Sequence, residues 1–302
     1  MIYRQQAELL IDTLPLVFQD DRIAMKGGTA LNLFLHDMPR LSVDIDITYL
    51  PLEDRKTAFS NIHSILSKIQ KRLQSTLGCE VNSSQKLDGS EKEVKLVVER
   101  NGVQIKVEPN FTIRGAVFSP EKRDIGQKCG KEFGKNATVP CLSRADLYGG
   151  KICAALDRQH PRDLFDVKIF FETGGFDRDV VAGFLFYLIS HNRPFHEVLS
   201  PHLKSLQSSY NAEFLGMTET MVALSDLEET RTNLVRSVLS ALTEKDRQFL
   251  LSVADVKPVW ELYPYPKIQE YPSVRWRLQN LKAMNGKKRK IQSDELKNLL
   301  KI

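Results

Sequence analysis

The first part of this chain changes between helical and strand-like spacing of its apolar residues. Residues 3–18 and 53–77 place apolar side chains at helical spacing, which predicts two amphipathic helices. Residues 42–48 alternate instead, with three apolar side chains facing one way and Asp44 and Asp46 facing the other. This alternation predicts a strand with one buried face and one polar face.

Turn residues connect these elements. Gly27-Gly28 follows a short apolar run and opens a short predicted helix. Farther along, the strand-like runs 94–99 and 103–111 are joined by Asn101-Gly102, and Asn-Gly is a strong signal for a β-hairpin. The region therefore combines strands and helices.

The second half of the chain is predominantly helical. Helices are predicted at 143–159 and from 161 to the glycines at 174–175, and the apolar run 180–189 predicts a buried helix. Further stretches with helical periodicity follow at 213–223, 230–242 and 246–253. We therefore expect a mixed α/β domain at 1–175 and a helical domain at 176–302.

Composition is that of a soluble globular protein. The chain has 302 residues, of which 42% are hydrophobic and 27% charged, so it can bury a sizeable core in two domains. A net charge of +5 permits a polyanionic partner. We see no apolar run of membrane-spanning length, no signal-peptide pattern at 1–10, and no paired spacing among the four cysteines. These features predict a cytoplasmic protein without membrane association.

Two carboxylates on one face of a strand repel each other unless a cation lies between them. Asp44 and Asp46 are such a pair. Mg²⁺ suits them because it takes a few carboxylate oxygens and completes its shell with water and phosphate. The Gly27-Gly28 turn lets backbone N–H groups approach a phosphate closely, and Thr29 adds a hydroxyl there. A site that holds a phosphate chain together with its metal would use all of these parts.

Glu108 supplies a third carboxylate. It follows the strand-like run 103–107 and precedes Pro109. If this strand pairs beside strand 42–48, three carboxylates from neighbouring strands could hold two metal ions, one for the attacking oxygen and one for the leaving oxygen. Such a site is typical of nucleotidyl transfer.

Three motifs resemble the AbiEii/AbiGii family, which comprises nucleotidyltransferase-like toxins of bacterial toxin–antitoxin and phage-defence systems. They are G-G-T-A-L at 27–31, R-x-S-x-D-I-D-I at 40–47 and K-x-x-A-x-x-x-R-x-x-x-R-D-L-x-D at 151–166. The resemblance covers roughly 20–175 by motif and the remainder by architecture. It implies an α+β fold, in which a polymerase-β-like nucleotidyltransferase domain is followed by a C-terminal helical bundle.

The resemblance also implies a metal site, a nucleotide site and partners. The residues concerned are Asp44 and Asp46 for Mg²⁺, Gly28 and Thr29 for the triphosphate of an NTP, and Lys151 and Asp163 for catalysis. The acceptor would be an RNA hydroxyl, such as the 3′ end of a tRNA, and the partner a cognate antitoxin of the AbiEi type. The basic stretch 118–135, interpreted as a loop, and the basic tail 282–290 are candidate RNA contacts.

Several of these residues have structural alternatives. Asp44 and Asp46 could be solvated side chains on an edge strand. Lys151 and Arg158 lie seven positions apart on one helix face, which could point to the nucleotide or to solvent. Arg40 could contact the substrate or pair with a carboxylate.

The R-D-L-x-D segment has a structural alternative of its own. Asp163 lies in the first turn of its predicted helix, where a carboxylate also stabilises the helix dipole. Arg162 and Asp166 are four residues apart and predict an ion pair. The family pattern favours Asp163 over Asp166 as the catalytic-site residue.

Three other activities compete with nucleotidyl transfer. A metal-dependent nuclease also needs clustered carboxylates, but it does not require the Gly-Gly-Thr turn. A non-catalytic nucleotide- or RNA-binding protein could be built on the same fold, although the intact Gly, Asp and Lys set argues against it. A kinase-like transfer to protein would move a γ-phosphate rather than an α-phosphate.

Overall fold

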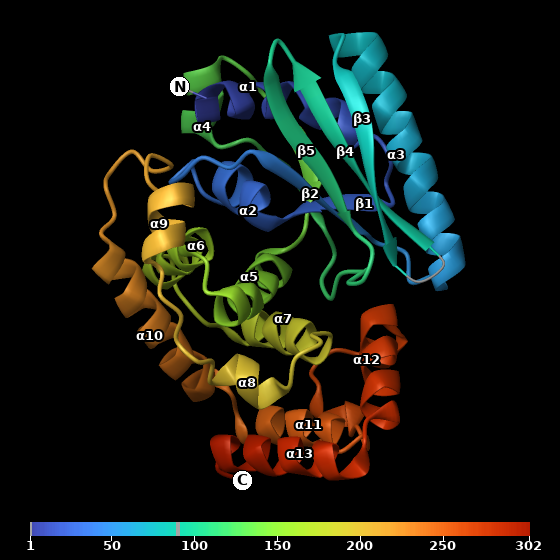
Figure 1. Cartoon of the computed structure of the whole chain (residues 1–302), viewed down its shortest axis with the longest axis vertical. Helices are drawn as coiled ribbons and strands as arrows, with labels where there is room; N and C mark the ends of the chain where they lie inside the picture. Colours follow the sequence, from blue (N-terminus) through green and yellow to red (C-terminus); the bar gives the residue numbers. More distant parts are fainter. Residues whose placement is uncertain (1, 89–90) are drawn as a thin grey trace. The chain divides into compact units, whose positions relative to one another are not determined.

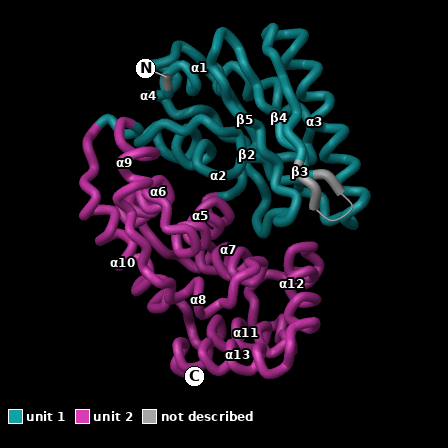
Figure 2. Tube along the Cα trace, viewed as in Figure 1, with its two compact units in different colours: residues 1–143, 217–219 teal, residues 144–216, 220–302 magenta. Residues whose placement is uncertain are grey.

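The computed structural model describes residues 2–88 and 91–302, and the chain forms two compact units (Figure 2). Unit 1 comprises the residues up to Ser143 together with Met217–Glu219, and unit 2 comprises Arg144–Gly216 and Thr220–Ile302. The named strands all belong to unit 1, whereas the described elements of unit 2 are helices. The predicted α+β class with C-terminal helices is confirmed.

Unit 1 is built on a seven-stranded sheet with the order β3-β4-β5-β2-β1-β7-β6 (Figure 1). The strands are β1 (Ile23–Lys26), β2 (Asp44–Tyr49), β3 (Glu80–Asp88), β4 (Glu91–Arg100), β5 (Val103–Asn110), β6 (Glu121–Asp124) and β7 (Thr138–Cys141). The central strand β2 is antiparallel to β1 and parallel to β5. The predicted hairpin is present as β4 and β5, with positive φ at both Asn101 and Gly102, as tight hairpin turns require.

The two predicted amphipathic helices are α1 (Ile2–Val17) and α3 (Arg55–Leu77). They contact each other, and they pack against β5 and β4 respectively. Helix α3 begins at Asp54, whose side chain accepts a hydrogen bond from the Thr57 amide, and it ends at Gly78 in the left-handed conformation. Their apolar stripes therefore form the core of unit 1.

The glycine turn lies directly after β1. Gly27–Thr29 forms the single turn α2, and the chain continues as a short π-helix, η1 (Ala30–Leu35). The predicted helix is therefore present, but it is wound more widely than an α-helix. Wide turns of this kind are frequent at functional sites.

The basic stretch 118–135 is not the predicted loop. It contains β6 and helix α4 (Gln127–Phe133), and Oδ1 of Asp37 accepts the Lys128 amide at 2.7 Å at the start of that helix. Three of its five basic side chains are in ion pairs, namely Arg123 with Glu121, Lys128 with Glu219, and Lys135 with Asp12 and Glu8. Contacts with residues distant in the sequence accompany a strand and a helix in this stretch, which its local composition did not predict.

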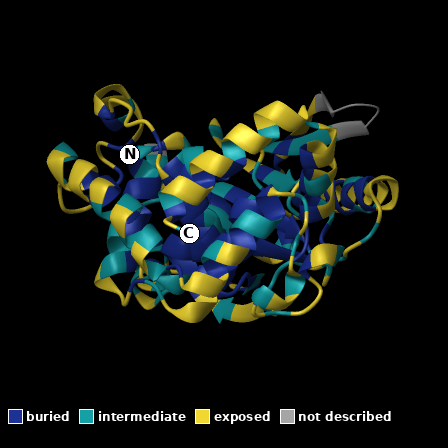
Figure 3. Cartoon of the chain, turned by 90° about the horizontal axis from the view of Figure 1, so that it is seen from below, coloured by how far each residue is buried: buried dark blue, intermediate teal, exposed yellow. Residues whose placement is uncertain are grey.

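Unit 2 packs around the helix α7 (Arg178–Ile189), which carries no charged residue after Asp179. Its residues 180–189 are all buried, as the sequence predicts for a helix segment that is apolar on every side. Figure 3 colours the chain by burial, with buried residues in dark blue. The other helices are α5 (Arg144–Arg158), α6 (Pro161–Glu172), α8 (Phe195–Leu199), α9 (Gln207–Glu213), α10 (Leu224–Ala241), α11 (Glu244–Ala254), α12 (Pro272–Ala283) and α13 (Gly286–Leu300). Two short 3-10 turns, η2 (Trp260–Leu262) and η3 (Ile268–Glu270), precede α12.

Helices α5 and α7 touch backbone to backbone at a pair of glycines. A Cβ atom on Gly149 would lie 2.4 Å from the carbonyl carbon of Gly183, and one on Gly183 would lie 2.4 Å from the carbonyl oxygen of Ala145. No side chain fits at either position, so this crossing depends on both glycines. It also explains why α5 belongs to the helical unit rather than to the sheet.

The units thus divide after Ser143, whereas the sequence placed the domain boundary at 175. The predicted helix at 213–223 is wrong: α9 ends at Glu213, and residues 217–219 return to unit 1. There the Leu41 amide donates to the carbonyl oxygen of Met217 at 2.9 Å. Across residues 2–88 and 91–302, no helix combines the length and apolarity of a membrane span.

Candidate active site

The glycine turn of unit 1 packs directly against the side chain of Asp46. A Cβ atom on Gly27 would lie 2.0 Å from Oδ2 of Asp46, and φ of Gly27 is +76°. Both the space and the backbone conformation therefore require glycine at this position. Gly27 and Asp46, nineteen residues apart in the sequence (46 − 27), meet as the spacing suggested.

Arg40 and Ser42 cover the second glycine of the turn. A Cβ atom on Gly28 would lie 2.8 Å from Nη2 of Arg40 and 3.1 Å from Oγ of Ser42. Arg40 is buried, and its Nη1 donates to the carbonyl oxygen of Leu41 at 2.8 Å. A backbone bridge from Arg40 to Thr218 adds a strand-like contact with the returning segment 217–219, which sequence reasoning missed. The structure therefore places Arg40 at the turn.

Thr29 is buried, and its hydroxyl is used inside the protein. It lies 2.9 Å from Oγ of Ser42 and 2.5 Å from the carbonyl oxygen of Asp44. These contacts fix the start of β2 against the glycine turn. A contact between Thr29 and a triphosphate stays a prediction.

The acidic residues of β2 face the same side of the sheet, since the alternating Ile45 and Ile47 are buried. In the sheet register Asp46 lies beside Lys26 on β1 and beside Glu108 on β5. Oε1 of Glu108 accepts a hydrogen bond from Lys95 at 3.1 Å. The expectation that β5 brings Glu108 next to the Asp pair is confirmed; its role as a ligand stays a prediction.

Two carboxylates on this face fit Mg²⁺, which uses one or two carboxylates and completes its shell with water and substrate phosphates. Within 2–88 and 91–302, no three His, Cys, Asp or Glu side chains are grouped closely enough to hold an ion by themselves. Asp44 and Asp46 would hold the metal, with the phosphates of the nucleotide as further ligands. The glycine contact with Asp46 is the observation that favours this fit.

Replacing Gly27 by alanine should disable this site. We expect at least a tenfold loss of catalytic rate, of the order seen when a supporting residue of a metal site is lost (about 10–100-fold), because the new methyl group displaces Asp46. The positive φ adds a cost of about 1–2 kcal/mol in stability. Gly102→Ala is the matched control, since Gly102 also has positive φ but has no atom within 4 Å of an added Cβ. Equal activity of the two variants in a single-turnover assay would contradict the proposed contact.

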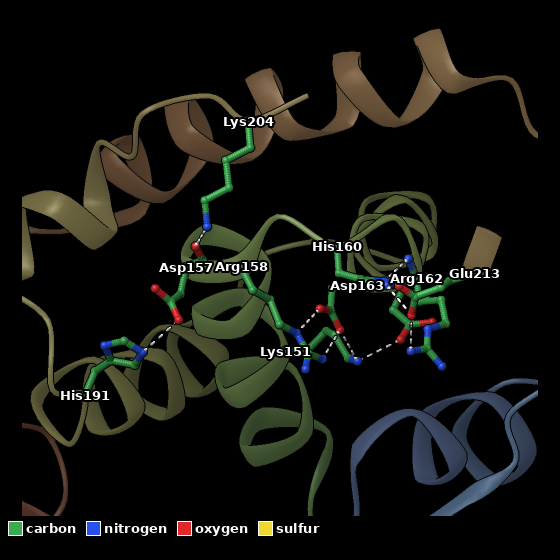
Figure 4. Close-up of polar contacts among 10 residues, drawn as sticks. Lys151, Asp157, Arg158, His160, Arg162, Asp163, His191, Lys204 and Glu213 are labelled. Atoms are coloured by element: carbon green, nitrogen blue, oxygen red, sulfur yellow. Dashed lines mark hydrogen bonds and ion pairs between the residues drawn. The ribbon is translucent and has the colours of Figure 1, made fainter. Parts of the chain in front are cut away.

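The predicted residues of unit 2 form a buried charge cluster (Figure 4). Nζ of Lys151, on α5, lies 2.9 Å from Oδ1 of Asp163 and 2.9 Å from Oδ2 of Asp166, both on α6. All three side chains are less than a tenth exposed. Sequence reasoning favoured Asp163, whereas the structure shows that Lys151 contacts both carboxylates. Their spacing of three residues on one helix face was the signal that could have indicated this.

Arg158 is the exposed member of the same cluster, and it contacts Asp163. Its Nε lies 2.5 Å from Oδ2 of Asp163, and its Nη2 lies 2.9 Å from Oδ1. The side chain itself is 62% exposed. Burial alone would raise the pKa of Asp163, but the charges of Lys151 and Arg158 outweigh it and hold this pKa well below its usual range. Asp163 is therefore a carboxylate at neutral pH.

The predicted pair between Arg162 and Asp166 is wrong. Asp166 faces Lys151, while Nη2 of Arg162 reaches Oε2 of Glu213 at 3.4 Å. The start of α6 is instead capped by His160, whose Nδ1 accepts the Arg162 amide at 3.1 Å. Asp166 faces the interior because it pairs with the buried Lys151, whereas the side chain of Arg162 is 34% exposed and pairs with Glu213.

The predicted site residues thus fall into two groups. The turn, Arg40, the Asp pair and Glu108 belong to unit 1, and the cluster around Lys151 belongs to unit 2. A glycine turn that packs against a strand with paired carboxylates, in a mixed sheet, is typical of nucleotidyltransferases. A family model described as "Nucleotidyl transferase AbiEii toxin, Type IV TA system" matches residues 8–280. The chain belongs to this family, as its motifs indicated.

A solved structure shows the same fold. MenT4, a nucleotidyltransferase toxin from Mycobacterium tuberculosis H37Rv, is 17% identical in sequence, with a TM-score of 0.59. The match covers 92% of this chain and 91% of that chain, so it includes the helical part as well as the sheet. A comparison with curated proteins gave no match. The chain is accordingly a nucleotidyltransferase of a type IV toxin–antitoxin family, which implies an NTP substrate and an antitoxin partner.

Proposed function

We propose that this toxin transfers a nucleoside monophosphate from an NTP to a hydroxyl of RNA, such as the 3′ end of a tRNA, with pyrophosphate as the leaving group. The observation that carries the proposal is the contact of Gly27 with Asp46, which joins a phosphate-binding turn to a metal-binding carboxylate. A nuclease needs the carboxylates but not this turn. The site therefore favours nucleotidyl transfer over RNA cleavage.

Each residue has a distinct task in this reaction. The Gly27-Gly28 backbone would receive the phosphate chain, with Arg40 beside it as a positive charge. Asp44 and Asp46 would hold Mg²⁺, and Glu108 would extend the acidic face for a second ion. Metal bound there would lower the pKa of the acceptor hydroxyl and neutralise charge on the leaving group.

The cluster around Lys151 contains two cations and two carboxylates, and its cations, Lys151 and Arg158, would be the groups that meet the nucleotide. Lys151 lies between two carboxylates, and one of them, Asp163, contacts both Lys151 and Arg158 and so orients the two cations. The exposed guanidinium of Arg158 is the part of this cluster that reaches solvent. We therefore assign Lys151 and Arg158 to nucleotide binding, and Asp163 to the placement of both.

We further propose an AbiEi-type antitoxin as the partner and the cytoplasm, where NTP and RNA occur, as the compartment. The basic tail at 282–290 remains a candidate RNA contact. The stretch 118–135 is a weaker candidate, because its ion pairs already neutralise three of its cations.

The test is incubation of the full chain with total RNA, Mg²⁺ and each α-³²P-labelled NTP in turn. We expect labelled RNA with at least one NTP, together with release of pyrophosphate. RNA that becomes shorter without any NTP would show a nuclease instead. A label that reaches protein from γ-³²P-ATP would show a kinase-like transfer.

A further inference from the structure

A polar groove of about 360 Å³ lies on unit 2 beside the buried charge cluster. Its lining includes Arg158, His160, Lys204, Ser205, Ser208 and Ser209. The roles proposed above use only Arg158 from this group. A volume of this size lies within the range of small-ligand sites, about 300–1,000 Å³.

The groove carries positive charge that the protein does not neutralise. Nζ of Lys204 donates to the carbonyl oxygen of Asp157 at 3.2 Å, and no carboxylate within 2–88 and 91–302 pairs with it (Figure 4). The carboxylate of Asp157 is instead occupied by Arg193 at 2.7 Å and His191 at 3.4 Å. The ammonium group of Lys204 can therefore serve a ligand.

One carboxylate, that of Glu213, also lines the groove. It is held by Nε2 of His160 at 3.1 Å and by Nη2 of Arg162 at 3.4 Å. Burial, followed by the charge of Arg162, lowers the pKa of His160 below its usual value, so the ring is neutral at pH 7. Arg162 thus offsets Glu213, and Arg158 is paired with Asp163, so the ammonium group of Lys204 is the charge of the groove that no described carboxylate offsets.

Gln159 belongs to the lining of this groove and has a strained backbone conformation. It is 2% exposed, and its φ of +53° is rare for a residue with a side chain. Its Nε2 donates to the carbonyl oxygen of His202 at 2.7 Å, and its Oε1 accepts the Lys204 amide at 3.0 Å. Nη1 of Arg231 reaches the same oxygen at 3.1 Å. The segment that carries Lys204 is therefore fixed next to Arg158, and strain of this kind is found at functional sites.

We propose that this groove binds a phosphodiester group of the RNA acceptor, through Lys204, the exposed guanidinium of Arg158 and the hydroxyls of Ser205 and Ser208. A phosphodiester presents one negative charge and several acceptor oxygens, which the Lys204 ammonium group, the neighbouring guanidinium and two hydroxyl donors can satisfy together. Because Arg158 also contacts Asp163, the subsite lies next to the cluster assigned to the nucleotide. The proposal rests on the proposed function insofar as that function names RNA as the acceptor.

The test is the affinity of the full chain for a fluorescent single-stranded oligoribonucleotide ending in CCA, measured against salt concentration. Lys204→Gln should weaken binding about tenfold, the loss expected for one charged hydrogen bond. It should also lower the slope of log affinity against log salt by about 0.7. The matched control is Lys257→Gln, an exposed lysine of unit 2 outside the groove, which should leave both values unchanged.

A second variant places a carboxylate in the groove. Ser205 is exposed, so Ser205→Glu should fold normally and should weaken RNA binding more than Lys204→Gln does. The affinity for free NTP should stay unchanged in both variants. Unchanged RNA affinity and slope in both would overturn the proposal, as would a loss of NTP affinity with RNA affinity retained, because the groove would then hold the triphosphate.

The outcome is separable from that of the proposed function. If Lys204→Gln weakens RNA binding but the wild-type chain labels no RNA, the proposal of an RNA-binding groove is supported and the proposal of nucleotidyl transfer to RNA is contradicted. If the chain labels RNA and neither groove variant changes its RNA affinity, the proposal of nucleotidyl transfer to RNA is supported and the proposal of the RNA-binding groove is contradicted.

Discussion

Asp46→Asn should lose nucleotidyl transfer while it keeps its fold. Asparagine has the same shape and leaves the contact with Gly27 intact, but it cannot supply a charged ligand oxygen. Loss of a supporting residue in a metal site costs about 10–100-fold, so the loss of a direct ligand should reduce the rate by at least about 100-fold. The melting temperature should stay equal or rise, because one carboxylate is removed from an acidic face that includes Glu108.

The measurement is single-turnover incorporation of α-labelled NTP, with the melting temperature of each variant recorded in parallel. Asp21→Asn is the control, since Asp21 is an exposed carboxylate of the same unit on a turn before β1. Activity of Asp46→Asn within a few-fold of that of Asp21→Asn, at saturating Mg²⁺, would remove Asp46 from the metal site.

The second large effect concerns the buried cluster of unit 2. Lys151→Met should destabilise the protein by about 3–5 kcal/mol, because it leaves Asp163 and Asp166 buried with the charge of Lys151 removed. Methionine keeps a similar length, so lost packing contributes little. Denaturant unfolding of the full chain measures this loss directly.

The compensating triple variant separates stability from catalysis. Lys151→Met combined with Asp163→Asn and Asp166→Asn removes the charges together, and it should recover most of the lost stability. If Lys151 serves the nucleotide, this folded variant should remain inactive. A triple variant with wild-type kinetics would show that the cluster has only a structural role. A triple variant as unstable as Lys151→Met would show that charge imbalance does not cause the loss of stability in the single variant.

Local patterns were sufficient for the elements that carry the chemistry. The alternation around Asp44 and Asp46 predicted β2, the Asn101-Gly102 pair predicted the β4–β5 hairpin, and the apolar run at 180–189 predicted buried α7. Each of these signals depends on neighbours within a few residues, where the period of the strand or helix fixes which side chains share a face. The family motifs then indicated the nucleotidyltransferase class.

Other features depend on partners that are far away in the sequence. The order in 118–135 comes from Asp37, Asp12 and Glu219, which a composition-based prediction cannot include. The division of the units after Ser143 follows from the close approach of Gly149 and Gly183, which local periodicity does not reveal. Helical periodicity likewise could not show that 217–219 pairs with the segment at Arg40.

By itself, the sequence determined which residues carry charge, which turns need glycine, and which face of each element is apolar, because these properties are local. Only the tertiary structure decided which acidic and basic side chains pair with one another. It placed Asp46 against Gly27, gave Lys151 two carboxylates instead of one, and left Lys204 without an acidic partner among the described residues. The physical reason is that the electrostatic environment of a buried or partly buried group is set by whatever packs around it, and those neighbours come from distant parts of the chain.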